Sequence, residues 1–170
     1  MRSEPIDPAG IEWTRVSPRY LLVRVVGWAA ATAGFTVLAC VPLLLRLTDL
    51  WRTVPAALAW SLPAAVVLVA AVRGALMWRQ VRAIGYAERN EDLLIRSGVL
   101  FQRTMVVPYG RMQYVDIAVG PVERALGLCT VKLHTASTET NAVIPGVPAL
   151  EGARLREQLS ARGEARLAGL

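Results

Sequence analysis

Two long apolar runs dominate the pattern of hydrophobic and polar positions along the chain. They extend from Val25 to Leu45 and from Thr53 to Val72, and arginines flank both of them. Each run has about the 20 residues that a helix rising ~1.5 Å per residue needs to cross a hydrocarbon layer ~30 Å thick. The pattern predicts two transmembrane spans in a helical hairpin over residues 19–80, after a polar cytoplasmic leader at 1–18.

Small residues recur at four-residue spacing inside the first run. Gly27 precedes Ala31, and Ala30 precedes Gly34, at this interval. Such spacing lets two helix backbones approach closely in lipid. We expect the two spans to pack on each other through these residues, rather than to present them as a dedicated dimer face.

Arginines near the span ends predict the orientation of the hairpin. Three precede the first span and four follow the second, whereas the connecting loop holds two: Arg15, Arg19 and Arg24, then Arg73, Arg79, Arg82 and Arg89, against Arg46 and Arg52. Because cytoplasmic flanks carry the excess of Lys and Arg, both termini are expected in the cytoplasm. The sequence thus predicts a multi-pass protein of the plasma membrane with a short external loop.

After residue 81 the hydrophobic period changes to two, which is typical of half-buried strands. We expect six strands, at Arg82–Glu88, Leu93–Ser97, Leu100–Pro108, Met112–Val119, Leu128–Ala136 and Asn141–Ile144. A helix follows over 149–162, with Leu150, Leu155 and Leu159 on one face, and Gly163 is expected to end it before a frayed tail at 164–170. A further short strand is expected in the leader, at Ile11–Val16.

These elements predict a mainly-β domain over residues 81–163, in addition to the membrane hairpin. Consecutive antiparallel strands followed by one amphipathic helix suit a half-open barrel of six or seven strands with the helix capping one end. Closing the sheet in this way protects strand edges that would otherwise invite aggregation. The seventh strand would come from the leader or from the connections between strands.

Composition and charge exclude several functions. The net charge is +6, but no dense basic run lies beside a series of aromatic residues, so nucleic-acid binding is not expected. Cys129 and His134 are the only nucleophile–base pair, and their spacing within one strand directs them to opposite faces. Asp116 and Glu123 show no partner for acid–base chemistry. One histidine and two distant cysteines make no zinc site. We therefore expect no enzyme, no metal and no cofactor.

Three motifs together carry a resemblance to a known family. They are Val107–Val115 (VPYGRMQYV), Gly120–Leu128 (GPVERALGL) and Val131–Ala136 (VKLHTA), and Ser17-Pro18-Arg19 stands before the first span. In this combination the chain resembles the bacterial pleckstrin-homology (PH) domain of the second type, in its YdbS-like membrane group. The family often has glycine where this chain has Ser137. The resemblance covers residues 11–162 and implies a PH-like fold for the strand domain.

The resemblance also implies what the protein does. Members of the group commonly occur beside a larger membrane protein with several copies of the same domain. It therefore implies a non-enzymatic interaction module anchored in the lipid bilayer, in a hetero-complex or self-associated, with a role in envelope stress tolerance or peptide export. A different class of function stays open from the residues alone, namely a small oligomeric transporter or channel subunit for a hydrophobic substrate.

Candidate contact residues are Arg111, Gln113 and Arg124 within the motifs. They could contact a ligand or partner, or they could hold turns and a sheet edge by hydrogen bonds. The first hairpin, where many PH domains bind phosphoinositides, reads Glu88-Arg89-Asn90-Glu91-Asp92 here. Three carboxylates against one guanidinium would repel a phosphorylated headgroup, so that activity is not expected.

Overall fold

The computed structural model describes residues 11–48, 55–135 and 142–167, and the chain divides into two compact units. One unit holds the long helices over residues 21–78. The other combines the leader up to Tyr20 with the chain from Arg79 onward, so that the leader shares a unit with the strand domain. The two units are described separately below.

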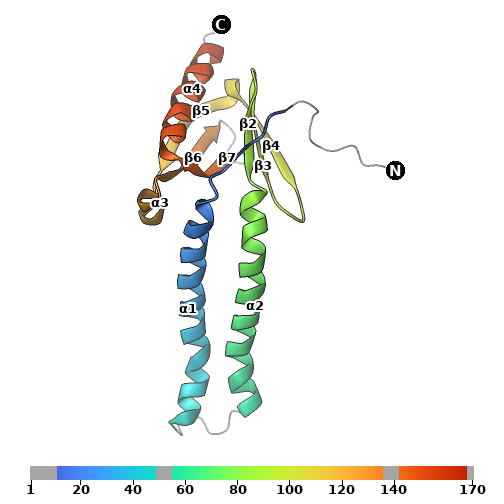
Figure 1. Ribbon diagram of the computed structural model, residues 1–170, viewed down its shortest axis with the longest axis vertical. Coiled ribbons are helices and arrows are strands. Elements are labelled where there is room, and N and C mark those ends of the chain that lie inside the picture. The colour runs from blue at the N-terminus through green and yellow to red at the C-terminus, as the bar shows by residue number, and fades with distance from the viewer. Residues whose placement is uncertain (1–10, 49–54, 136–141, 168–170) are drawn as a thin grey trace, which may run out of the picture. The chain divides into compact units, whose positions relative to one another are not determined.

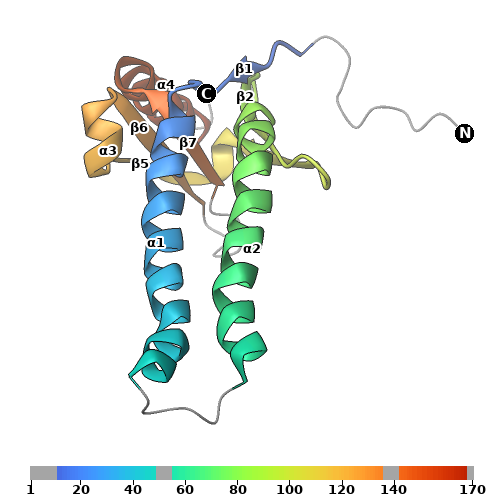
Figure 2. The same cartoon turned by 60° about the horizontal axis from the view of Figure 1, so that its bottom comes forward.

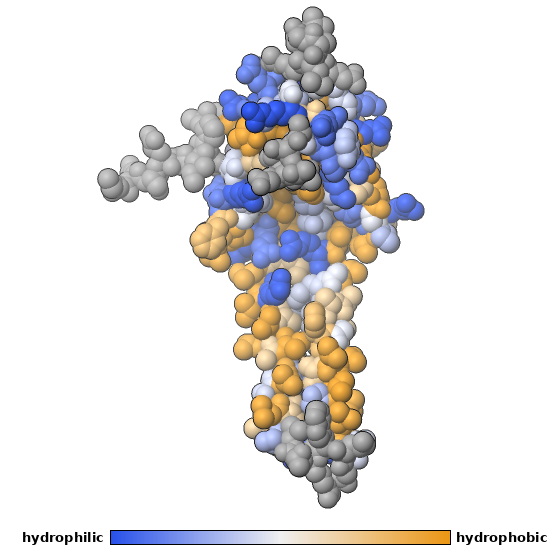
Figure 3. All heavy atoms as spheres, turned by 180° about the vertical axis from the view of Figure 1, so that it is seen from behind, coloured by the Kyte–Doolittle hydropathy of each residue, from blue (hydrophilic) through white to orange (hydrophobic). Residues whose placement is uncertain are grey.

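Helices α1 (Tyr20–Leu47) and α2 (Ala56–Arg82) lie side by side (Figures 1 and 2). Their mean hydropathies over the most apolar stretch are 1.9 and 1.8, so both are long and apolar enough to cross a membrane. Hydrophobic residues cover the face of this unit seen in Figure 3. Pro42 and Pro63 lie inside the helices without ending them, as membrane helices allow.

The close contact between these helices differs from the predicted one. A Cβ atom added at Gly74 would lie 3.3 Å from the indole ring of Trp28, so the missing side chain makes room for that ring. By contrast, a Cβ atom at Gly27 or Gly34 would meet nothing within 4 Å. The prediction that these two glycines pack one span on the other is therefore wrong.

In the described residues of the second unit, seven strands form two antiparallel sheets. The first sheet has the order β1 (Thr14–Arg15), β2 (Gly85–Glu88), β3 (Asp92–Ser97) and β4 (Arg103–Pro108), and the second has β5 (Met112–Ala118), β6 (Leu128–Thr135) and β7 (Ala142–Pro148). The 3-10 helix η1 (Tyr109–Arg111) joins the sheets, and α3 (Pro121–Ala125) precedes β6. Because β4 and β5 do not pair, the barrel is half-open, as predicted.

Strand β1 is the seventh strand, which was expected from the leader or from the connections between strands; it is shorter than the predicted Ile11–Val16. It pairs antiparallel with β2, with Thr14 opposite Tyr86 and Arg15 opposite Gly85. Just beyond it, the Ser17 N–H donates a hydrogen bond of 2.9 Å to the carbonyl oxygen of Gly146 in β7. The leader is thus bonded to both sheets before α1 begins.

Several predicted element boundaries are wrong, each for a local reason. The strand expected from Arg82 starts at Gly85, because α2 continues to Arg82. The strand expected from Leu100 starts at Arg103, since residues 98–102 form the turn of the β3–β4 hairpin. The last strand runs through Pro145 to Pro148; β7 pairs only with β6, and an edge strand tolerates proline. The predicted starts at Thr53 and Asn141 lie outside the described residues.

Helix α4 (Ala149–Leu167) packs on β5, β6, β7 and η1 and covers the core. Leu155 and Leu159 are fully buried, whereas Leu150 is 90% exposed, so its predicted place on the buried face is wrong. Gly163 does not end the helix, which continues to Leu167 into the expected tail. The other large side chains at the centre of the domain are Leu93, Leu94, Val107, Tyr109, Val131, Leu133, Ile144 and Val147.

The contact between α4 and β6 generates a stability prediction. A Cβ atom at Gly152 would overlap the Sγ atom of Cys129, which is 1% exposed. We expect Gly152→Ala to lower the free energy of unfolding by about 1–3 kcal/mol through overpacking. Adding Cys129→Ala removes the sulfur and should restore part of that loss. Thermal unfolding of the full chain in detergent, followed by circular dichroism, measures both effects; additive losses in the double variant would contradict this packing.

Candidate interaction site

The three candidate contact residues all lie on the surface, but they do not form one cluster. Arg111 ends η1 and Gln113 lies at the start of β5, whereas Arg124 lies in α3, beyond the other end of that strand. At about 3.3 Å per residue, β5 separates the two positions by about 20 Å. Arg111 and Gln113 therefore form one candidate site, and Arg124 belongs to another part of the surface.

Gln113 occupies a β-bulge on an open edge. Met112 pairs with Thr135 and Tyr114 pairs with His134, so that Gln113 has no residue opposite it in β6. Strand β5 is the edge of its sheet, next to the gap that separates it from β4. A bulge redirects the local side chain, and an unpaired edge presents N–H and C=O groups to a partner.

Tyr109 holds the start of this edge in place. It is fully buried; its hydroxyl donates a hydrogen bond of 2.9 Å to the Arg89 carbonyl oxygen, and its N–H donates one of 3.1 Å to the Glu91 carbonyl oxygen. The Arg162 guanidinium of α4 donates to the same hydroxyl at 3.0 Å and lies 5.3 Å from the ring centre. Burial raises the pKa of the Tyr109 hydroxyl, which Arg162 opposes, so the phenol stays neutral at physiological pH.

Glu123 explains most of the second motif without any ligand. Its side chain is buried, and its carboxylate accepts hydrogen bonds from the Gly120 N–H at 2.8 Å and from the Thr130 hydroxyl at 2.7 Å. These contacts hold α3 against β6. Gly127 then enters β6 with φ of +67°, the left-handed conformation that favours glycine. Arg124, next to Glu123 in the helix, is left on the exposed face.

A network of charges, which we call the α4 clamp, fixes the β2–β3 hairpin to the C-terminal helix. It consists of Tyr86, Glu88, Glu151, Arg154 and Arg162. Arg154 donates to Glu88 at 2.6 Å and also pairs with Glu151, while the Tyr86 hydroxyl donates to Glu151 at 3.1 Å. The Arg162 guanidinium donates a hydrogen bond of 3.2 Å to the Arg89 carbonyl oxygen. The same guanidinium lies 4.0 Å from the Glu88 carboxylate.

The pKa shifts in the α4 clamp follow from these contacts. Hydrogen bonding from Arg154 lowers the pKa of the Glu151 carboxyl, and bonding to Glu151 and Glu88 raises the pKa of the Arg154 guanidinium. Burial, together with the negative charge of Glu151, raises the pKa of the Tyr86 hydroxyl. These directions keep Glu151 ionised, Arg154 charged and the Tyr86 hydroxyl protonated at neutral pH.

Sequence reasoning missed the helix half of this clamp, although a signal was present. Glu151, Arg154, Gln158 and Arg162 recur at three- and four-residue spacing, which places them in one polar stripe along α4. The stripe runs beside the buried Leu155 and Leu159. A polar stripe that borders a buried helix face lies at the edge of the helix–sheet contact, where its side chains can form ion pairs with a charged hairpin.

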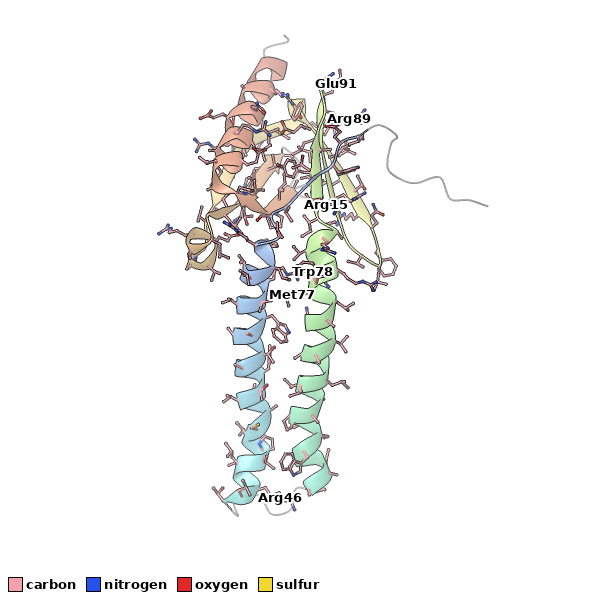
Figure 4. All side chains as sticks on the ribbon, in the orientation of Figure 1. Arg15, Arg46, Met77, Trp78, Arg89 and Glu91 are labelled. Atoms are coloured by element: carbon pink, nitrogen blue, oxygen red, sulfur yellow. The ribbon has the colours of Figure 1, made fainter. Side chains whose placement is uncertain are left out.

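The hairpin turn itself encloses an open hollow of about 430 Å³, lined by Arg89, Asn90, Glu91 and Asp92. The Arg89 Nε atom lies 3.6 Å from Asp92 Oδ1, close enough for an ion pair but too far for a hydrogen bond. Figure 4 shows Arg89 and Glu91 at this turn. With Glu88 held by Arg154, the turn keeps its acidic side chains where a phosphoinositide site would need cations.

The candidate nucleophile and base make separate structural contacts. Cys129 is buried beside Gly152, and burial raises the pKa of its thiol, which makes it a poor nucleophile. His134 stacks on Tyr114 with a ring-centre distance of 4.3 Å. In the described parts of the chain, no three His, Cys, Asp or Glu side chains gather as metal ligands would.

The two apolar helices, the half-open pair of sheets and the capping helix define a PH-like domain on a membrane hairpin. The chain belongs to the family described as Bacterial PH domain, whose model matches residues 20–163. It is also 35% identical over 75 residues to the UPF0699 transmembrane protein YdbS of Bacillus subtilis (strain 168). That alignment covers 44% of this chain and 46% of YdbS, so the chain matches about half the length of this curated relative. No solved structure matched the chain.

The α4 clamp generates a stability prediction with a matched control. We expect Arg154→Gln to lower the free energy of unfolding by about 1 kcal/mol, since partly exposed ion pairs contribute on that scale. Arg156→Gln removes the same charge from an exposed neighbouring position of α4 and should have little effect. In a Cys40→Ala background, the buried Cys129 thiol reacts with a maleimide only when the domain unfolds. The extent of its labelling during heating therefore compares the stability of the parent chain, Arg154→Gln and Arg156→Gln.

The contribution of the clamp also depends on pH. Because the pKa of Glu151 is lower in the folded chain, its ionised form stabilises folding above its ordinary pKa of 4.5. That stabilisation is lost as the pH falls through the lower, folded pKa. The gap in stability between the parent chain and Arg154→Gln should therefore be full at pH 7 and shrink as the solution is acidified below 4.5. A gap of the same size in strong acid would contradict the clamp.

Proposed function

We propose that the protein is a non-catalytic, membrane-anchored interaction module that works in a membrane protein complex on the cytoplasmic side. The observation that carries the proposal is the α4 clamp. It uses Arg154 and Arg162 of α4 to neutralise the chain's own Glu88 and to hold the hairpin backbone. A hairpin closed in this way favours a structural role over headgroup binding.

The open edge of β5 supports contact with another protein. Arg111 and Gln113 are exposed there, Gln113 as the unpaired residue of the bulge. A strand from a partner can pair with such an edge, and the two polar side chains would set its register. Arg124 would act at a second contact beyond the other end of β5.

The partner that we propose is a larger membrane protein with several copies of the same PH-like domain, or else a second copy of this chain. Each copy of a half-open barrel offers a complementary open edge, which favours association between like domains. The role in envelope stress tolerance or peptide export, and the alternative of a transporter subunit, stay predictions.

Purification in mild detergent tests the complex. The tagged full chain should co-purify with a membrane protein that carries repeated PH-like domains, or run at the mass of a defined oligomer. We expect Arg111→Glu with Gln113→Glu to reduce recovery of the partner severalfold, because the added carboxylates lie at the proposed contact. Arg124→Glu tests the second contact in the same way.

Arg156→Glu is the matched control, since it reverses an exposed charge on α4 and changes no residue of η1 or β5. It should leave partner recovery unchanged. A chain that purifies in mild detergent only as a monomer, without a partner, would contradict the proposal. If Arg156→Glu reduced recovery as much as Arg111→Glu with Gln113→Glu, the loss would come from the change in net charge and not from the β5 edge.

The cytoplasmic placement has its own test, which starts from the arginine excess outside the connecting loop. In a Cys40→Ala background, Cys129 is buried and should not react. A membrane-impermeant maleimide should label the Thr48→Cys chain on intact cells, and the Asn90→Cys chain only after permeabilisation, since both positions are exposed. Labelling of the Asn90→Cys chain on intact cells would reverse the orientation.

A further inference from the structure

The tip of the β3–β4 hairpin carries three consecutive apolar residues on its surface. Val99 is 43% exposed, Leu100 is 85% exposed and Phe101 is 91% exposed. We call these three residues the apolar tip. Single exposed hydrophobic residues are ordinary, but a contiguous group at the end of a projecting hairpin marks a contact surface.

The turn that carries the apolar tip has a defined shape. Ser97 pairs with Arg103 at the last rung of the hairpin, and Gly98 follows with φ of +103°. A Cβ atom at Gly98 would overlap the carbonyl oxygen of Phe101. Only glycine lets the chain turn so closely, and the turn holds Leu100 and Phe101 outward.

Strand register places the apolar tip at the end of the sheet from which both membrane connections leave. Arg15, Gly85, Arg96 and Thr104 stand opposite one another across the four strands. After Arg15, four residues lead to α1, and before Gly85, two residues lead back to α2. The hairpin between β3 and β4 turns at this same end (Figure 1).

Charge divides the two ends of this sheet. The end with the apolar tip carries Arg15, Arg96 and Arg103, and no acidic residue occurs from Leu93 to Pro108. The other end carries Glu88, Glu91 and Asp92 at the β2–β3 turn. Figure 4 shows Arg15 at the opposite end from Arg89 and Glu91. An anionic bilayer attracts the first end and repels the second.

We propose that the apolar tip inserts into the boundary between headgroups and acyl chains of the membrane that holds α1 and α2. The connections of four and two residues, each with a reach of about 3.3–3.6 Å per residue, tie this end of the sheet to the ends of α1 and α2. Leu100 and Phe101 enter the apolar layer, and Arg103 meets anionic headgroups. This contact needs the membrane anchor, but not the partner complex proposed above.

Depth-dependent quenching in the full chain tests this contact. An environment-sensitive fluorophore is attached at Leu100→Cys in a Cys40→Ala background, in vesicles of phosphatidylcholine and phosphatidylglycerol in equal amounts. We expect blue-shifted emission and severalfold stronger quenching by doxyl lipids than for the same fluorophore at Asn90→Cys. Asn90 lies in the exposed turn at the other end of β3, so its label should be quenched by aqueous iodide instead.

Two further variants separate apolar insertion from general surface effects. Phe101→Gln should weaken the doxyl quenching severalfold, whereas Val106→Gln, at a 48% exposed position within β4, should not. Arg103→Gln should weaken it in the mixed vesicles but not in phosphatidylcholine alone. Co-purification of a partner should be unaffected by Phe101→Gln, which distinguishes this inference from the proposed function.

Two results would overturn the inference. Iodide quenching at Leu100→Cys equal to that at Asn90→Cys would place the apolar tip in water. Protection that appears only when many copies share one vesicle, with disulfide cross-links between Leu100→Cys chains, would assign the tip to a second copy of this chain and not to lipid.

Discussion

The antiparallel pairing of β1 with β2 is the constraint on which the rest of the structure depends. It joins a segment before the first membrane helix to the segment that follows the second, with Thr14 opposite Tyr86. Both membrane connections therefore leave the sheet at one end, over four residues and two residues. The pairing thus brings the segment before α1 and the segment after α2 together at one end of the first sheet.

The two ends of that sheet have opposite character, and each follows from its neighbours. At the β2–β3 turn, Arg154 and Arg162 of α4 compensate Glu88, so the acidic turn is stabilised by the chain itself. At the β3–β4 turn, Leu100 and Phe101 are left without cover by any described part of the domain. The first hairpin is therefore held by contacts within the domain, whereas the second leaves apolar side chains exposed.

The sequence predicted the features that depend on local periodicity. The two long apolar helices are present, and Cys129 and His134 lie on opposite faces of β6, with Cys129 buried. It failed where tertiary contacts override local signals. Helix α4 continues through Gly163, which is buried near the Tyr109 carbonyl oxygen, and proline is accepted in β7 because that strand is an edge. The α4 clamp joins residues more than 60 positions apart, which no local period encodes.

The same reasoning explains how a PH-like fold can serve a membrane without reading one particular lipid. Selective headgroup binding needs several converging cations in a pocket, and here the cations near the first hairpin are already paired with carboxylates. A contact made by apolar side chains and an adjacent arginine recognises the bilayer and its surface charge, not a specific headgroup. In the contact proposed for the apolar tip, the apolar helices α1 and α2 would supply most of the affinity for the membrane.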